Sequence, residues 1–590
     1  MNVSKSSHRC LRFSARVLGQ VSLAAVVAGG AVGCGSAGGS DPSSSNTMQQ
    51  DANGGSPVNG AGGSSVVVNP SGGNANSGGA PVVVANPPPV TDPTTLNPGY
   101  IPASRINSAE YNNTVADLLG TTQRPGEFFL AATVTGFDTN AAALSDVSAS
   151  DVQAYFDAAK ALVDEAFADP VAKARIMICA TADATCARQI IEAFGAKAWR
   201  RPLTTDEGDK LLARYTEATT MLGKDHEAAV AHVIRIMLTS APFLYLIETD
   251  PDNQQAAVAN RALNGYELAS RLSYTIWGSM PDDALFAAAA DNTLLDNTVL
   301  GAQVDRMLSD PKGGRFLERF FNQWLQIREL AGHQVDPMHY PGWSEDMRAA
   351  MFADAANFFG KFVTGGLSWS QFLSADLDTT NTTLAPIYAN DPPGFRSGFL
   401  GLPAFLTARS VPTRTAPTFR GKTVLDALLC TTIEVPPNVM IPQLEVAGGA
   451  AVDPNNIRQK LEAHRMSPDC AACHASLDPI GLGLENYDAI GHYRTAYESG
   501  LAIDSSGQIG TQAFTTPTQL AQILSADPHY AGCPSKKLVS LSLRRTLRME
   551  DGPYVDQISM AWNSGTIADL VKMLVTNDVF RFRRLPQSAL

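Results

Sequence analysis

The chain has 590 residues, of which 44% are hydrophobic and 17% are charged, and its formal net charge is -13. This length suffices for several domains. The acidic balance argues against a nucleic-acid partner, because binding to a phosphate backbone requires clustered basic residues. A basic run at residues 581–584 is interpreted as the solvated end of a helix.

The N-terminus has the pattern of an export signal. Basic residues between Lys5 and Arg16 precede a short, Gly-rich apolar stretch over residues 17–32, which is too short for a good membrane span. The stretch ends in Ala31-Val32-Gly33-Cys34, which is similar to a bacterial lipobox. We therefore expect residues 1–33 to be a lipoprotein signal peptide and Cys34 to carry a lipid. Plain secretion is the alternative, since Ala31 stands where such motifs usually have Leu.

Residues 34–98 form a segment of distinct composition. Gly, Ser, Asn and Pro dominate it, and charges are few. Such a composition cannot bury enough apolar surface to offset chain entropy. The sequence therefore predicts a disordered tether between the lipid on the membrane and the folded part of the chain. Gly35, directly after Cys34, favours the outer membrane, facing the periplasm or the cell surface.

The rest of the chain carries the patterns of helices. Capping boxes, in which a cap side chain and a Glu satisfy free backbone amides, occur at Asn107 with Glu110, Thr204 with Glu207, and Asn264 with Glu267. Aromatic residues at i, i+4 and i+8, namely Phe316, Phe320 and Trp324, predict a buried helical stripe. Ile567, Leu570, Val571 and Leu574 predict an amphipathic helix near the C-terminus.

The segment Cys470-Ala471-Ala472-Cys473-His474 has the C-x-x-C-H spacing at which a haem is attached covalently. Two thiols three positions apart can meet the two vinyl groups of one porphyrin, and the adjacent imidazole then ligates the iron. Attachment of this kind takes place outside the cytoplasm, in agreement with the export signal. The expected cofactor is haem c, held by Cys470, Cys473 and His474 with the iron on His474.

Two other interpretations of the motif remain open. His464, Cys470, Cys473 and His474 could supply a Cys2His2 zinc site, although the adjacency of Cys473 and His474 strains a tetrahedral arrangement. A redox dithiol or disulfide of the thioredoxin kind is the other, without the strand-helix-strand pattern that usually surrounds it.

The sixth ligand of the iron would decide the chemistry. Met549 is our first choice, because in small haem modules this ligand comes from a later loop, and the other candidates are Met466, His464 and His492. A Met ligand favours electron transfer, whereas an open position permits peroxide or oxygen chemistry. A carbonyl in the segment Asp478-Pro479-Ile480, read as a loop, is expected to accept the second ring proton of His474. Arg465 and Arg494 could pair with propionates, although solvated or carboxylate-paired side chains are the more ordinary interpretation.

Four further cysteines are available for disulfides in an oxidising compartment. We expect Cys179 to pair with Cys186 and Cys430 with Cys533, although four thiols allow three connectivities.

Several sequence segments together resemble a bacterial family often labelled planctomycete-type cytochrome c, which is built from successive domains of unknown function. The segments are Arg105-Ile106-Asn107 with Glu110-Tyr111-Asn112, Trp199-Arg200-Arg201-Pro202-Leu203-Thr204, Ser270-Arg271-Leu272-Ser273-Tyr274, Met280-Pro281-Asp282-Asp283, the C-x-x-C-H motif, and Leu484-Glu485-Asn486-Tyr487-Asp488-Ala489-Ile490-Gly491. The resemblance implies a haem and export by a bacterium, but no settled reaction. One departure is visible: the family usually reads Tyr-Ala-Leu-Gly-Arg where this chain has Leu541-Ser542-Leu543-Arg544-Arg545.

The expected fold is mainly α, with several helical modules followed by a cytochrome-c-like haem module and preceded by the tether. The expected boundaries are 99–165, 166–255 and 256–390 for three helical modules, 391–505 for the haem module, and 506–590 for a C-terminal helical module.

The leading functional hypothesis is an exported, lipid-anchored haem protein that transfers electrons with a redox partner protein, coupled to oxidation or reduction of an unidentified substrate. A haem peroxidase or oxygenase with an open sixth position is one alternative, and a surface binding scaffold with a structural haem is another. Nucleophile elbows, zinc helices, Walker loops and dinucleotide fingerprints are absent from the sequence.

Overall fold

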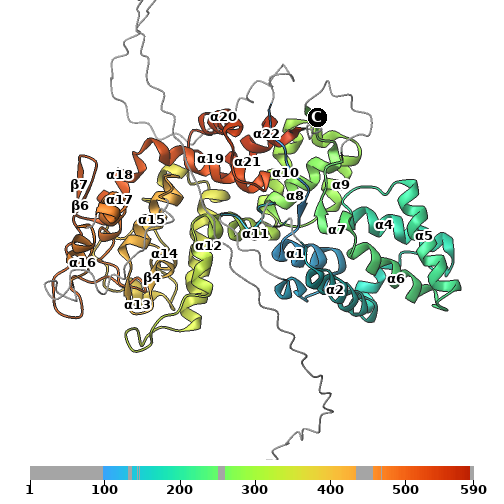
Figure 1. Ribbon diagram of the computed structural model, residues 1–590, viewed down its shortest axis with the longest axis horizontal. Coiled ribbons are helices and arrows are strands. Elements are labelled where there is room, and N and C mark those ends of the chain that lie inside the picture. The colour runs from blue at the N-terminus through green and yellow to red at the C-terminus, as the bar shows by residue number, and fades with distance from the viewer. Residues whose placement is uncertain are drawn as a thin grey trace, which may run out of the picture. The chain divides into compact units, whose positions relative to one another are not determined.

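Helices dominate the computed structural model (Figure 1), which describes residues 97–584 apart from 130–135, 142–143, 145–146, 250–259, 434–455 and 467. The mainly α fold class predicted from the sequence is confirmed. The expected signal peptide, the expected lipidation site Cys34 and all but the last two residues of the expected tether lie outside the described residues.

The first helices share one hydrophobic core. They are α1 (Ser108–Leu119), α2 (Ala149–Ala168), α3 (Pro170–Ile176), α4 (Ala184–Ala198), α5 (Thr205–Thr220), α6 (His226–Leu238) and α7 (Ala241–Leu244). In Figure 1, α4, α5 and α6 lie side by side, and they also contact one another closely. Tyr111, Leu162, Ile190 and Met237 are buried in this core, which Tyr274 from a later helix completes. The first two expected helical modules therefore pack together.

A second and larger core collects most of the remaining described helices. They are α8 (Gly265–Ile276), α9 (Asp283–Ala290), α10 (Asn297–Ser309), α11 (Gly314–Phe316), α12 (Glu345–Val363), α13 (Ala385–Tyr388), α14 (Pro403–Ala408), α15 (Pro417–Leu428), α17 (Pro468–Leu482), α18 (Pro517–Ser525), α19 (Pro528–Leu543), α20 (Gly552–Trp562), α21 (Ile567–Thr576) and α22 (Asp578–Arg581). Helix α16 (Ile457–His464) instead packs in a small separate cluster with Leu482 of α17. Helix α10 packs along α21, so segments far apart in the sequence share this core.

Short antiparallel pairs of strands join distant parts of the described chain. Strand β1 (Ser104–Arg105) pairs with β2 (Tyr245–Leu246), and β3 (Asn260–Ala262) pairs with β8 (Phe582–Arg584). Strands β4 (Ser410–Val411) and β5 (Arg414–Thr415) form a hairpin, as do β6 (Gly507–Ile509) and β7 (Gln512–Phe514). The first two pairs bring the start of the described chain, its middle and its end to one place.

The predicted capping boxes and apolar stripes are confirmed. Asn107, Thr204 and Asn264 each form a capping box with the Glu three residues later. Phe316, Phe320 and Trp324 are buried, although the turn between them is a π-helix, η4 (Leu317–Asn322), that follows α11. The four apolar residues predicted for the last amphipathic helix are fully buried on α21.

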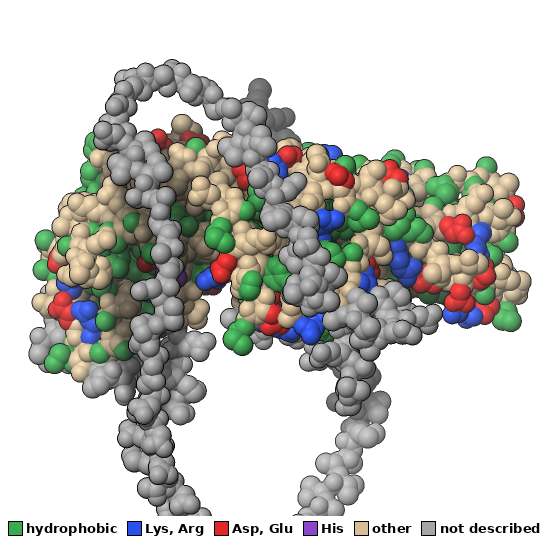
Figure 2. Space-filling view, turned by 90° about the horizontal axis from the view of Figure 1, so that it is seen from above, with side chains coloured by type: hydrophobic (Ala, Val, Ile, Leu, Met, Phe, Trp, Pro, Cys, Tyr) green, Lys and Arg blue, Asp and Glu red, His purple; other side chains and the backbone are tan. Residues whose placement is uncertain are grey.

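Charged side chains of both signs are intermingled on the face shown in Figure 2. Many are paired within or between helices, such as Lys160 with Asp164 and Arg188 with Asp209. Exposed pairs of this kind contribute little to stability, typically about 0–1 kcal/mol. The stability of the fold therefore depends mainly on the two cores.

Candidate functional site

The C-x-x-C-H motif lies on α17, which is held closely against α15. A Cβ atom added at Gly421 would lie 2.0 Å from the carbonyl oxygen of Leu477, and one added at Gly481 would lie 1.8 Å from that of Pro417. Only glycine permits this approach. Pro417 meets Gly481 and Leu477 meets Gly421, so the two helices run antiparallel. The C-terminal end of α15 therefore lies toward the cysteine end of α17. Figure 1 shows the two helices side by side.

The three motif residues share one face of α17, since positions i, i+3 and i+4 of a helix are neighbours. Cys470 is buried, and Cys473 is half-buried against the larger core. Both are free thiols. Next to them, the His474 side chain retains 16% of its exposure. Two free thiols and an imidazole on one face are the protein groups that covalent haem attachment requires.

Asp478 orients the imidazole of His474. Its two carboxylate oxygens lie 3.0 and 3.1 Å from Nδ1 of His474, and an ionised carboxylate accepts only, so Nδ1 carries the proton and donates it. The Nε2 lone pair is then left for an axial bond. Asp478 is fully buried and also accepts a hydrogen bond from Thr418 Oγ1 of α15, at 3.0 Å.

This arrangement corrects one prediction. The segment Asp478-Pro479-Ile480 is not a loop, because α17 continues through Pro479 to Leu482, and the acceptor is the Asp478 carboxylate rather than a backbone carbonyl. A helical interpretation of the segment would have found it, since His474 and Asp478 are four residues apart and therefore on one face.

His464, at the end of α16, lies beside the motif. Its ring centroid is 4.6 Å from that of His474. Burial lowers the pKa of His464, and the neighbouring His474 lowers it further. Within the described ranges, no group of three or more His, Cys, Asp or Glu side chains is arranged to hold a metal ion.

The other three candidates for a sixth ligand are exposed to solvent or bonded to another side chain. Met549 begins η10 (Met549–Asp551), directly before α20, and its side chain is 95% exposed. In Figure 1, α20 lies apart from α17, with α19 between them. The structure thus does not bring Met549 to His474, because the chain after α19 packs α20 against α19 and α21 instead. Met466 is 83% exposed, and His492 is bonded to Asp488.

The segment after the motif is held from the inside by Arg420 of α15. This fully buried guanidinium donates to the backbone carbonyls of Leu484, Tyr487 and Asp488. Burial lowers the pKa of Arg420 to about 10. The Leu484 segment is therefore scaffold for the motif helix. Arg465 and Arg494 lie near the carboxylates of Asp478 and Glu485, at 3.9 and 3.2 Å.

Among the described cysteines, disulfides join Cys179 to Cys186 and Cys430 to Cys533. They join the pairs expected from the sequence. Cys430 directly follows the last turn of α15, and Cys533 lies on α19. The second bond therefore ties the helix that supports the motif to the C-terminal helices.

Five domains match the chain, each described as a protein of unknown function. In chain order they are DUF1587 (residues 104–168), DUF1595 (186–248), DUF1592 (263–389), DUF1588 (396–497) and DUF1585 (510–580). The C-x-x-C-H motif falls within the fourth match. No curated protein and no solved structure matches the chain. The order of the five domains is that of the planctomycete-type series, and the chain belongs to this family.

Proposed function

We propose that this protein is an exported, lipid-anchored c-type haem protein that transfers electrons to or from a partner protein, coupled to oxidation or reduction of a substrate. The observation that carries the proposal is the face of α17: two free thiols and an imidazole whose Nδ1 is bonded to a buried carboxylate. Cys470, Cys473 and His474 would hold the haem, which would supply one-electron redox chemistry.

The residues around the motif support attachment at a fixed orientation. Asp478 holds the His474 ring, Thr418 holds Asp478, and the glycine contacts hold α17 against α15. Each interaction lies on the motif helix or on the helix beneath it. These contacts hold the motif helix and the helix beneath it in one relative position.

Anchoring would depend on Cys34, outside the described residues. Across the part of the chain that the structure describes, no helix has the length and apolar character needed to cross a bilayer. Expression of the full chain with and without Cys34→Ala, followed by membrane fractionation, tests the anchor. Release of the variant from the membrane fraction supports it, and equal retention of both proteins contradicts it.

Covalent haem attachment is tested on protein produced in a bacterium that exports it and attaches c-type haems. A sharp α band on reduction and retention of the haem through acid-acetone extraction are expected. Cys470→Ser with Cys473→Ser should lose the band, whereas Cys179→Ser, which removes an unrelated cysteine, should keep it. Extraction of haem from the unaltered protein, or equal behaviour of the two variants, would overturn the proposal. Reversible one-electron reduction in a redox titration is expected for an electron carrier.

A further inference from the structure

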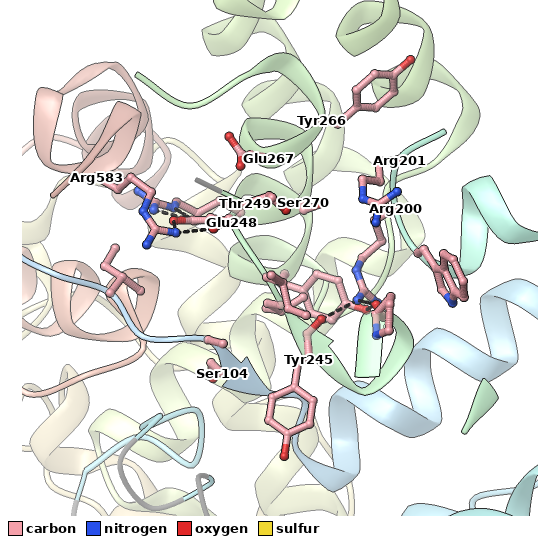
Figure 3. Close-up of a pocket in the computed structure, with 18 of the residues that line it drawn as sticks. Ser104, Arg200, Arg201, Tyr245, Glu248, Thr249, Tyr266, Glu267, Ser270 and Arg583 are labelled. Atoms are coloured by element: carbon pink, nitrogen blue, oxygen red, sulfur yellow. Dashed lines mark hydrogen bonds and ion pairs between the residues drawn. The ribbon is translucent and has the colours of Figure 1, made fainter. Parts of the chain in front are cut away.

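A cavity of 740 Å³ is lined by residues that do not include the C-x-x-C-H motif. Its volume is in the range of small-molecule sites, about 300–1,000 Å³. Four of the five matched domains contribute to its lining, through Ser104, Arg200, Ser270 and Arg544. Figure 3 shows that residues from both ends of the sequence, including Ser104 and Arg583, surround the same space as Arg200 and Ser270.

Arg200 is the distinctive cation of this cavity. It is 4% exposed, and its hydrogen bonds go to neutral oxygens: the backbone carbonyls of Pro242, Phe243 and Tyr245 and the hydroxyl of Tyr274. Among the described residues, no carboxylate forms an ion pair with it. Because these partners are neutral, no opposite charge compensates the guanidinium, and its field is strong in a medium of low dielectric constant.

Other arginines of the lining are paired with carboxylates, but these pairs do not make the cavity negative. Arg201 pairs with Glu207, and Arg271 with Glu248. Arg544 pairs with Glu110, but that carboxylate is shared with a second guanidinium, that of Arg319. The walls of the cavity and the residues directly behind them thus hold more positive than negative charge, in a chain whose net charge is -13. A positive cavity in an acidic protein concentrates anions.

The rest of the lining is largely aromatic and apolar. It includes Trp199, Tyr266, Tyr274 and Ile247. These side chains can pack against the apolar body of a ligand, while Arg200 supplies a positive charge.

We infer that this cavity binds a small organic carboxylate, with the carboxylate near Arg200 and an apolar body against the aromatic wall. The inference does not depend on a haem. The positive charge of Arg200 selects an anion over a neutral molecule of the same shape. The aromatic wall favours a ring-sized body over a small inorganic ion.

The test is calorimetric titration of the full chain with 2-naphthoate and with the neutral isostere 2-naphthamide. Naphthoate should bind, and the amide about tenfold more weakly or worse, since an interaction between two charged groups is roughly twice as strong as its neutral counterpart. Naphthoate binding should also weaken with added salt. Equal affinities for the two probes, or no naphthoate binding, would overturn the inference.

Variants locate the binding. Ser270 lies on α8 in the cavity wall, and its side chain makes no hydrogen bond within the described residues. Ser270→Trp fills the space without altering a charge and should reduce naphthoate affinity about tenfold or more, since the ligand would lose its apolar contacts. Ser270→Ala is the matched control and should bind as the unaltered protein does. Unchanged affinity in Ser270→Trp would place the binding elsewhere and contradict the inference.

Arg200→Gln tests the charge itself. It should remove the preference for naphthoate over naphthamide. Since Arg200 also holds three backbone carbonyls, the variant is first checked for an unchanged circular dichroism spectrum, and the Ser270 pair decides the question if it does not fold. A folded Arg200→Gln protein that still prefers naphthoate would contradict the assignment of the carboxylate to Arg200.

Discussion

Arg544 and Glu110 form a buried, two-point ion pair across 434 positions of sequence. Arg544 Nη1 lies 2.6 Å from Glu110 Oε1, and Nη2 lies 2.9 Å from Oε2. Burial by itself raises the pKa of Glu110, but Arg544 and Arg319 lower it to about 2. The pair connects the first matched domain with the last. Arg544 stands at the position where the family resemblance predicts Gly. Its backbone has a left-handed φ of 55°, which glycine adopts without strain.

Arg544→Gly is expected to destabilise the fold despite relieving this strain. Relief of a left-handed conformation gains about 1 kcal/mol. Removing one partner of a buried pair costs about 3–5 kcal/mol, here reduced because Arg319 remains beside Glu110. The free energy of unfolding of this variant, measured with urea, is expected to be lower by about 2–3 kcal/mol. Asn563→Gly, at an exposed helix end with φ 46°, is the matched control and should be neutral or slightly stabilising. Equal stability of Arg544→Gly and the unaltered protein would contradict the role of the pair.

Asp354 should give the fold an unusual pH dependence. Burial raises the pKa of Asp354 to about 6, although the hydroxyl of Tyr388 donates to it at 3.2 Å. The folded state therefore holds a proton that the unfolded state releases near pH 4, and this group's contribution to stability falls as the pH rises from about 4 to about 6. Asp354→Asn should remove that slope and stabilise the protein at pH 7 by about 1–3 kcal/mol.

The comparison is made by urea unfolding at pH 5 and pH 7. Asp346→Asn, on the exposed first turn of the same helix, is the control and should keep the slope. A stability difference between the two pH values that is the same in Asp354→Asn and in the unaltered protein would contradict the prediction.

If the proposed haem is attached at the C-x-x-C-H motif, Asp478 should tune its reduction potential without being needed for its attachment. A carboxylate on Nδ1 makes the His474 imidazole a stronger donor to iron and lowers the reduction potential. Asp478→Asn is therefore expected to keep the covalent haem and to raise the midpoint potential in a redox titration. Asp488→Asn is the matched control, because Asp488 holds His492 in the same i, i+4 geometry. The midpoint potential of this control variant should equal that of the unaltered protein. Equal shifts in both variants would contradict the assignment.

The two disulfides should differ in their effects. The Cys430–Cys533 bond closes a loop of 103 positions and the Cys179–Cys186 bond one of 7. In the chain-entropy model the long loop contributes about 4–5 kcal/mol and the short one about 2–3 kcal/mol. Cys430→Ser with Cys533→Ser should lower stability more than Cys179→Ser with Cys186→Ser. The Cys430→Ser with Cys533→Ser variant should also show a broader absorption spectrum of the proposed haem, since Cys430 follows the helix that supports α17. Peptide mapping without reduction checks the pairing, and free thiols at Cys430 and Cys533 would remove the basis for this prediction.

Local patterns in the sequence determined much of the secondary structure. The capping boxes at Asn107, Thr204 and Asn264 were predictable because a cap and its Glu are three residues apart, within a single turn. The apolar stripe of α21 was predictable because 3.6-residue periodicity alone specifies which side chains share a face. The C-x-x-C-H motif belongs to the same class, since its three groups lie within five residues.

Only the tertiary structure decided which distant residues meet. Nothing near Arg420 in the sequence indicates that it holds the carbonyls after the motif, because those carbonyls are brought to it by the packing of α17 on α15. Likewise, the Arg544–Glu110 pair and the cavity at Arg200 are assembled from segments hundreds of residues apart. Such contacts depend on the summed burial of many side chains in the cores, and not on any spacing that a single segment carries.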